Sequence, residues 1–123
     1  MPEYLSPDWF AAAAGLVAGS AVLAERSRGV HLVIAQIVHD GDAEICWALR
    51  LDDGTASLTT GRADDATVSF SCARDTADAI HSGERSAQAA FIAGDLRIGG
   101  DVSALMKHAS LFADLDDVLA TLR

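Results

Sequence analysis

Residues 30–60 limit the fold most strongly, because they combine strand-forming segments with two tight-turn signals. Residues 30–38 are rich in Val, Ile and Leu, which is typical of a β-strand. Two turns follow, at 39–42 and 52–54, and each contains an Asp-Gly pair that favours a β-hairpin. Residues 44–51 alternate between these turns, so one face of the strand carries Ile45, Trp47, Leu49 and Leu51. The pattern predicts an antiparallel sheet with one apolar face and one solvated face.

Two further segments extend this sheet. Residues 55–60 and 66–71 combine β-branched residues with small polar ones and predict a third and a fourth strand. The four segments together predict an antiparallel meander. Residues 96–98 lie between two glycine-containing turns and predict a short additional strand.

Helical patterns precede and follow the strand segments. Ser6 and Pro7 suit the cap and first turn of a helix that we expect to end near residues 27–29. Four more helices are expected after the fourth strand, over 76–81, 87–93, 101–111 and from about Asp114 onward. The predicted fold class is therefore α+β, with a mostly antiparallel sheet and helices over one face.

Charge and cysteine content restrict the partners and the compartment. The 123 residues include 9 basic and 18 acidic ones, a formal net charge of −9. Nucleic-acid binding needs clustered Lys and Arg, which the sequence lacks, so we expect no nucleic-acid partner. The apolar segment 10–24 is too short for the ~30 Å core of a bilayer, so we expect no stable membrane insertion. Cys46 and Cys72 lie in apolar stretches and indicate two buried thiols in a reducing cytoplasm.

Residues 83–108 carry the most recognisable pattern of the chain. In order they contain a short helix, a glycine, a short strand with one basic residue, a glycine pair and a helix with a Met-Lys pair; these are residues 87–93, Gly94, residues 96–98, Gly99-Gly100 and Met106-Lys107. Together with the strand-turn-strand unit at 47–60 and the strand and short helix at 66–82, this part of the chain resembles the sterol carrier protein type-2 family. The whole chain, residues 1–123, looks like a single-domain, stand-alone, bacterial-type member.

The resemblance implies a five-stranded sheet whose helices enclose an apolar tunnel for a fatty acyl chain, a sterol or a similar molecule. It implies a lipid carrier or presenter that needs no cofactor and is not an enzyme. Burial of apolar ligand surface, at ~0.8 kcal/mol per methylene, is consistent with such a role. The candidate wall residues are Ile45, Trp47 and Leu49 on the sheet and Phe91, Leu105, Met106 and Phe112 on helices. Gln88 matches a family position near the ligand, where its amide can bind a hydroxyl or carboxyl head. Ordinary core packing, or an exposed helix position for Gln88, explains the same residues.

Motifs for other chemistry are missing from the sequence. It contains no nucleophile elbow, P-loop or dinucleotide fingerprint, and its His and Cys residues never fall at metal-pair spacing, so we expect no metal site. One alternative is an interaction or regulatory protein whose apolar groove receives a partner's hydrophobic segment or, as a homodimer, a second copy of the chain. A small enzyme such as a cone-fold isomerase is another. It would need a buried Asp or Tyr, and we expect the only tyrosine, Tyr4, to lie on a frayed N-terminal segment.

Overall fold

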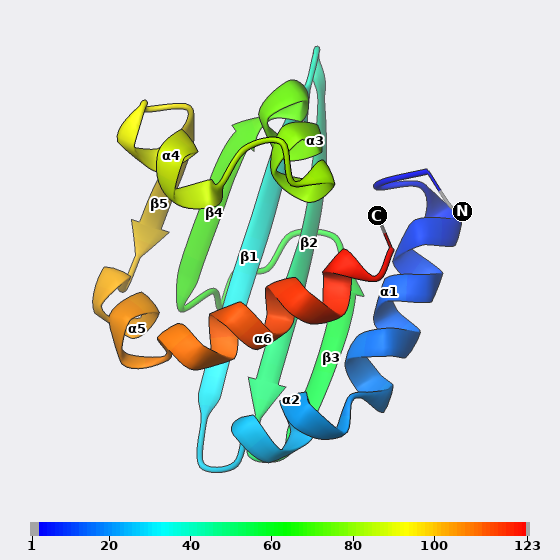
Figure 1. Ribbon diagram of the computed structural model, residues 1–123, viewed down its shortest axis with the longest axis vertical. Coiled ribbons are helices and arrows are strands. Elements are labelled where there is room, and N and C mark those ends of the chain that lie inside the picture. The colour runs from blue at the N-terminus through cyan, green and yellow to red at the C-terminus, as the bar shows by residue number, and fades with distance from the viewer. Residues whose placement is uncertain (1–2, 123) are drawn as a thin grey trace.

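A five-stranded mixed sheet, covered by helices on one face, organises the described residues (Figure 1). The structure is a computed structural model that describes residues 3–122. The predicted domain, residues 1–123, extends beyond them by Met1, Pro2 and Arg123. The strands are β1 (His31–Asp40), β2 (Ala43–Asp52), β3 (Thr55–Thr60), β4 (Val68–Ala73) and β5 (Leu96–Gly100), in the spatial order β3-β2-β1-β4-β5. The α+β class and the mostly antiparallel sheet are confirmed, since only the β1–β4 pair is parallel among these strands.

The position of β4 differs from the predicted meander. The first three strands do form antiparallel hairpins, but β4 then pairs with β1 in parallel, with Ile34 opposite Val68. Residues 61–67 carry the chain from β3 to this distant position, and the Thr67 amide at their end donates to the Val33 carbonyl at 2.8 Å. The prediction of a continuous meander was therefore wrong, because periodicity shows which residues share a face but not which strand is the neighbour.

The helix-covered face of the sheet is apolar, as the alternation predicted. Ile34 on β1 lies opposite Leu49 on β2, and Leu32 lies opposite Leu51. All four side chains are buried, and Trp47 is buried with them. The opposite face is polar: Arg50 points there and pairs with Asp65 of the crossing segment at 2.8 Å. The large buried side chains therefore lie on the side where the helices pack, and only small ones such as Ala35 and Ala48 are buried on the opposite face among the described residues.

The N-terminal helical region consists of two helices and not one. They are α1 (Pro7–Gly19) and α2 (Ala21–Arg26). The predicted cap at Ser6 is confirmed, because its hydroxyl accepts a backbone hydrogen bond from the first turn. Ser20 has extended backbone geometry, and its hydroxyl accepts from the Leu23 amide at 3.2 Å, so it ends one helix and caps the next. This break lets α1 follow the β3 edge while α2 turns toward the end of the sheet (Figure 1).

The remaining helices agree with the predictions except near residue 108. They are α3 (Arg74–Ser82), α4 (Ala87–Ile92), α5 (Val102–Lys107) and α6 (Ala109–Ala120). Ser86 caps α4 and Asp101 caps α5, as expected. The last helix begins after His108 and not near Asp114, which was predicted as its start. Asp114 lies within α6 and pairs with Arg26 of α2 at 2.7 Å, so its carboxylate serves a tertiary contact and not a cap.

The glycine pair at the end of β5 has a steric cause. Gly100 has a φ of +81°, and a Cβ at this position would lie 2.5 Å from the Thr67 carbonyl oxygen. The next amide, that of Asp101, donates to the same oxygen at 2.8 Å. A side chain at residue 100 would therefore push β5 away from β4 and strain the backbone.

Candidate functional site

A cavity of about 540 Å³ lies between the covered face of the sheet and helices α3 and α6. Apolar strand residues form one wall and helix residues the other; they include Ile34, Val38, Leu49, Phe70 and Leu96 on the sheet and Ala77, Ile80, Phe112, Leu115 and Leu119 on the helices. The volume falls within the ~300–1,000 Å³ of typical small-molecule sites. An apolar molecule of this size therefore fits the cavity, which is partly open to solvent.

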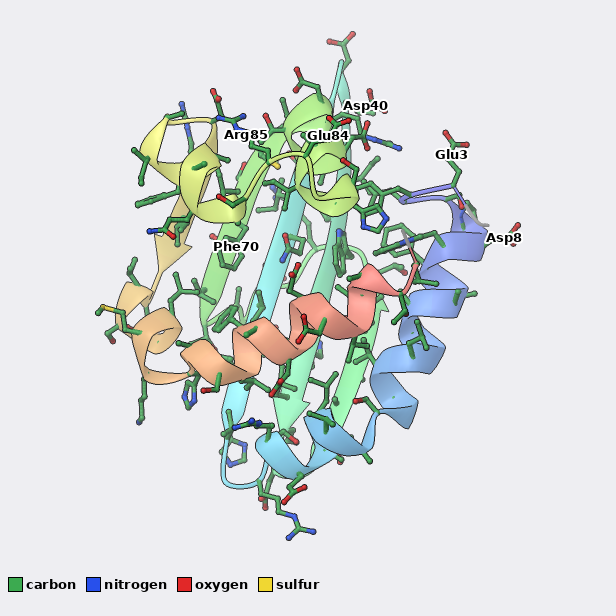
Figure 2. The ribbon with its side chains drawn as sticks, in the orientation of Figure 1. Glu3, Asp8, Asp40, Phe70, Glu84 and Arg85 are labelled. Carbon is green, nitrogen blue, oxygen red and sulfur yellow. The ribbon has the colours of Figure 1, made fainter. Side chains whose placement is uncertain are left out.

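The sheet wall follows directly from strand periodicity, since Leu49 and Ile34 are register neighbours on adjacent strands. Phe70 stands on the covered face of β4, between α6 and the loop that carries Arg85 (Figure 2). Its ring lies 6.1 Å from that of Phe112, at an interplanar angle of 71°. This edge-to-face contact connects the sheet wall with the helix wall.

Polar groups line the cavity at a few points, and the strongest cation among them is already paired. Arg85 donates to Asp95 at 2.6 Å. Burial, with a smaller effect of Asp75, raises the pKa of the Cys72 thiol, so this group is neutral near pH 7. Gln36 contributes an uncharged amide from the middle of β1. The deep wall therefore offers hydrogen bonding without a free positive charge.

Tyr4 is a cavity residue that the sequence analysis missed. It was expected on a frayed segment, yet its ring stacks on His81 at 4.1 Å and meets Trp9 edge-on at 4.9 Å. The Tyr4 carbonyl also accepts a hydrogen bond from Arg74 at 2.8 Å. Burial, followed by the charges of Cys72 and Asp78, raises the pKa of the phenol, which stays protonated. No local pattern near the N-terminus indicated these long-range contacts.

A smaller cavity of about 140 Å³ adjoins the large one. The two share five wall residues: Tyr4, Gln36, Ile80, Asp116 and Leu119. Trp9, Trp47, His81 and Ala120 complete the smaller cavity, and the rings of the two tryptophans lie 5.5 Å apart. Within residues 3–122, neither buried indole N–H has a hydrogen-bond partner.

The predicted site residues fall into three groups. Leu49 and Phe112 line the larger cavity, and Trp47 lines the smaller one. Ile45 and Leu105 are partly buried against the core. Gln88, Phe91 and Met106 are exposed and lie outside the cavity walls. Their binding roles stay predictions.

The exposed group has a geometric cause. Met106 is 83% exposed, because the buried residue of α5 is Ala104, two positions earlier and almost half a turn away. In α4 the buried residue is Ala90, and Gln88 precedes it by the same two positions. In helices of only six residues, the spacing of apolar residues does not show which residue is buried.

The two cysteines lie on opposite faces of the sheet. Cys72 faces the large cavity, whereas Cys46 lies beneath the crossing segment and donates to Glu44 at 3.3 Å. Burial and this hydrogen bond raise the pKa of Cys46. Neither thiol has the lowered pKa of a reactive nucleophile. Within residues 3–122, no group of three or more His, Cys, Asp or Glu side chains could hold a metal ion.

Helix length bears on membrane topology. Among residues 3–122, no helix has the length and apolar character that crossing a bilayer requires.

Comparisons with known proteins agree with this geometry. Residues 16–113 match the model of the SCP-2 sterol transfer family. A crystal structure of sterol carrier protein 2 superimposes with a TM-score of 0.76 and 19% identity, covering 96% of this chain and 98% of that one. A conserved hypothetical protein from Thermus thermophilus gives 0.74 and 19%, with coverage of 97% and 89%. The apo form of sterol carrier protein 2 from Yarrowia lipolytica gives 0.67 and 20%, with coverage of 89% and 85%. The comparison with curated proteins finds no match.

Proposed function

The chain belongs to the SCP-2 sterol transfer family, and from this premise we propose that it binds a lipid-like molecule in the 540 Å³ cavity, as a carrier or presenter. The ligand class is a fatty acyl chain, a sterol or a molecule of similar shape. The observation that carries the proposal is the apolar cavity itself, formed by the covered sheet face and by α3 and α6. We further propose that residues 1–123 act as one lipid-binding domain.

The energetics of such a cavity favour long apolar ligands. Each buried methylene contributes ~0.8 kcal/mol, so a twelve-carbon chain supplies on the order of 10 kcal/mol before the cost of immobilising it. Phe70 and Phe112 add flat apolar surface to the sheet wall and the helix wall of the cavity. The affinity therefore comes mainly from the apolar tail of the ligand, and the polar wall residues determine which head groups are bound.

The same walls favour carriage over chemistry. Family membership supports lipid binding or transfer in general. The Cys72 thiol that faces the ligand space has a raised pKa, as does the Tyr4 phenol, so both groups are protonated near neutral pH. Neither is poised to act as a nucleophile or base. The cytoplasmic location inferred from the thiols stays a prediction.

The test is a binding assay on the purified chain. Native mass spectrometry and organic extraction should first show whether a lipid co-purifies. A fluorescent fatty acid should then bind the delipidated protein saturably, with a Kd at or below about 1 µM (roughly −8 kcal/mol), and acyl chains or sterols should displace it. No saturable binding by any member of the panel at about 100 µM (roughly −5.5 kcal/mol) would refute the carrier role. A stoichiometric dimer that excludes the probe would assign the groove to a second copy of the chain.

A further inference from the structure

We propose that the exposed apolar side chains of α4 and α5, together with two cations beside them, form a peripheral docking surface for a bilayer that contains anionic lipids. This surface, the α4–α5 patch, consists of Phe91, Ile92, Arg97, Val102, Met106 and Lys107. The inference goes beyond lipid binding in the cavity, because it concerns how the chain meets a source of lipid. The contact is interfacial, since α4 and α5 have six residues each and are too short to cross a bilayer.

The apolar part of the patch holds most of the exposed apolar side chains of the described chain. Six large apolar side chains are exposed among residues 3–122, and four of them belong to the patch. Ile92 is 75% exposed, and Met106 is 83% exposed. The core takes only Ala90 from α4 and only Ala104 from α5, so both helices turn larger apolar residues outward. Exposed apolar residues gathered in this way indicate an interaction surface.

The patch lies at one edge of the sheet, beside the ligand cavity. Figure 1 shows α4 and α5 at the two ends of β5, on the edge opposite the one that α1 follows. Ala87, the first residue of α4, lines the large cavity, as do Arg85 and Ser86 before it. Ile92 ends the same helix, about 8 Å further along its axis. A bilayer on the patch therefore lies close to the wall of the cavity.

The charge distribution favours an anionic bilayer at this place. Residues 83–108 contain three basic and three acidic residues, whereas the rest of the chain contains six basic and fifteen acidic ones. The rest of the chain therefore repels an anionic surface, and the neutral region does not. Two copies of the chain also repel each other, because each carries a net charge of −9. This repulsion disfavours a second copy as the partner of the patch.

The two cations of the patch are available to lipid head groups. Arg97 and Lys107 are exposed, and no ion pair within the described chain uses either of them. The acids closest to them in sequence have other roles: Asp95 pairs with Arg85 at 2.6 Å, and Asp101 caps α5. Head-group phosphates can therefore pair with both cations while the apolar side chains enter the interface.

Vesicle binding tests the patch. The purified chain is mixed with vesicles of phosphatidylcholine alone, or of phosphatidylcholine with phosphatidylglycerol, and the bound fraction is measured by flotation at low and high salt. We expect the chain to bind the anionic vesicles at least about tenfold more tightly than the neutral ones, and salt to weaken this binding. No binding to the anionic vesicles, or equal binding to both kinds, would refute the proposal.

Matched charge reversals locate the cationic contact. Arg97→Glu and Lys107→Glu should each lower the affinity for anionic vesicles at least about fivefold. Arg28→Glu changes the net charge equally, at an exposed position between α2 and β1 that also forms no ion pair with a described residue. It should lower the affinity less than about twofold. Equal losses in all three variants would show a response to net charge alone, and the assignment of the patch would be wrong.

A second pair of variants tests the apolar contact. Ile92→Asp should weaken binding to anionic vesicles about tenfold, because the carboxylate stays in water where the isoleucine enters the interface. Val22→Asp makes the same change in charge at another exposed apolar helix position, which is 51% exposed on α2. Its effect should be less than about twofold. Similar losses in the two variants would contradict docking through α4.

Fluorescent fatty-acid binding in solution separates this inference from the proposed function. None of the patch residues lines the large cavity, so Ile92→Asp and the charge variants should keep the wild-type Kd. Intact fatty-acid binding without vesicle binding would refute the docking surface and leave the carrier role standing. Vesicle binding without fatty-acid binding would do the reverse. If light scattering shows a dimer that Ile92→Asp dissociates, the patch is an interface between two copies, and the bilayer proposal is refuted.

Discussion

Filling the large cavity from its helix wall should stabilise the protein. Ala77 lies on α3, is 5% exposed and lines the 540 Å³ space. Ala77→Leu adds three carbon atoms, which contribute up to about 2.4 kcal/mol when they leave water for an apolar wall. Ordering the new side chain costs about 0.5–1 kcal/mol. We therefore expect the free energy of unfolding to rise by about 1.5 kcal/mol.

A matched alanine gives the opposite expectation. Ala13 lies on α1 and is 0% exposed, but it lines none of the cavities described above. Ala13→Leu adds the same atoms to a packed region and should cost about 1–3 kcal/mol. Both variants place leucine in a helix, so the difference in the sign of the effect reports local space and not helix propensity.

Urea unfolding of the delipidated proteins, followed by circular dichroism, measures both changes. A titration with the fluorescent fatty acid then measures the ligand site. Ala77→Leu should weaken binding by tenfold or more, about 1.4 kcal/mol, because the leucine occupies ligand space. If Ala77→Leu destabilises the protein as much as Ala13→Leu does, the walls are closed on each other in solution. The cavity argument would then be refuted.

Three further variants or probes test individual parts of the structure. A ligand concentration of one hundred times its Kd should slow the alkylation of Cys72 about 100-fold. The alkylation rate of Cys46, on the opposite face, should not change, and equal slowing of both cysteines would place the ligand elsewhere. Because both thiol pKa values are raised, mass spectrometry should show labelling of each cysteine accelerating as the pH rises above neutral. Gly100→Ala should lower stability in a urea melt by at least ~1–2 kcal/mol, since its φ is positive and Thr67 blocks a Cβ; an unchanged midpoint would contradict this steric reading. Met106→Trp should change stability by less than ~0.5 kcal/mol because the side chain is exposed, and a tenfold loss of affinity would restore Met106 to the ligand site.

The sequence alone determined the local architecture, since short-range geometry sets it. The Asp-Gly turns at Gly41 and Gly54 require backbone conformations that glycine adopts easily, and the hairpins form there with positive φ values. Alternation placed Trp47, Leu49 and Leu51 on one buried face. Side-chain capping predicted the starts of α1, α4 and α5. These features depend on residues within a few positions of one another, and the family pattern follows from them.

Only the tertiary structure decided how distant segments meet. The parallel pairing of β4 with β1 depends on the path of residues 61–67 and not on strand periodicity. The rotation of α5, which turns Met106 outward, depends on how the chain leaves β5. The small cavity likewise joins Tyr4 and Trp9 to Gln36 and Trp47, which lie far along the chain from them. Such contacts form because the helices pack on the sheet as a whole. Their free energy comes from the burial of apolar surface between segments far apart in the sequence, and no local sequence pattern predicts which of these segments will meet.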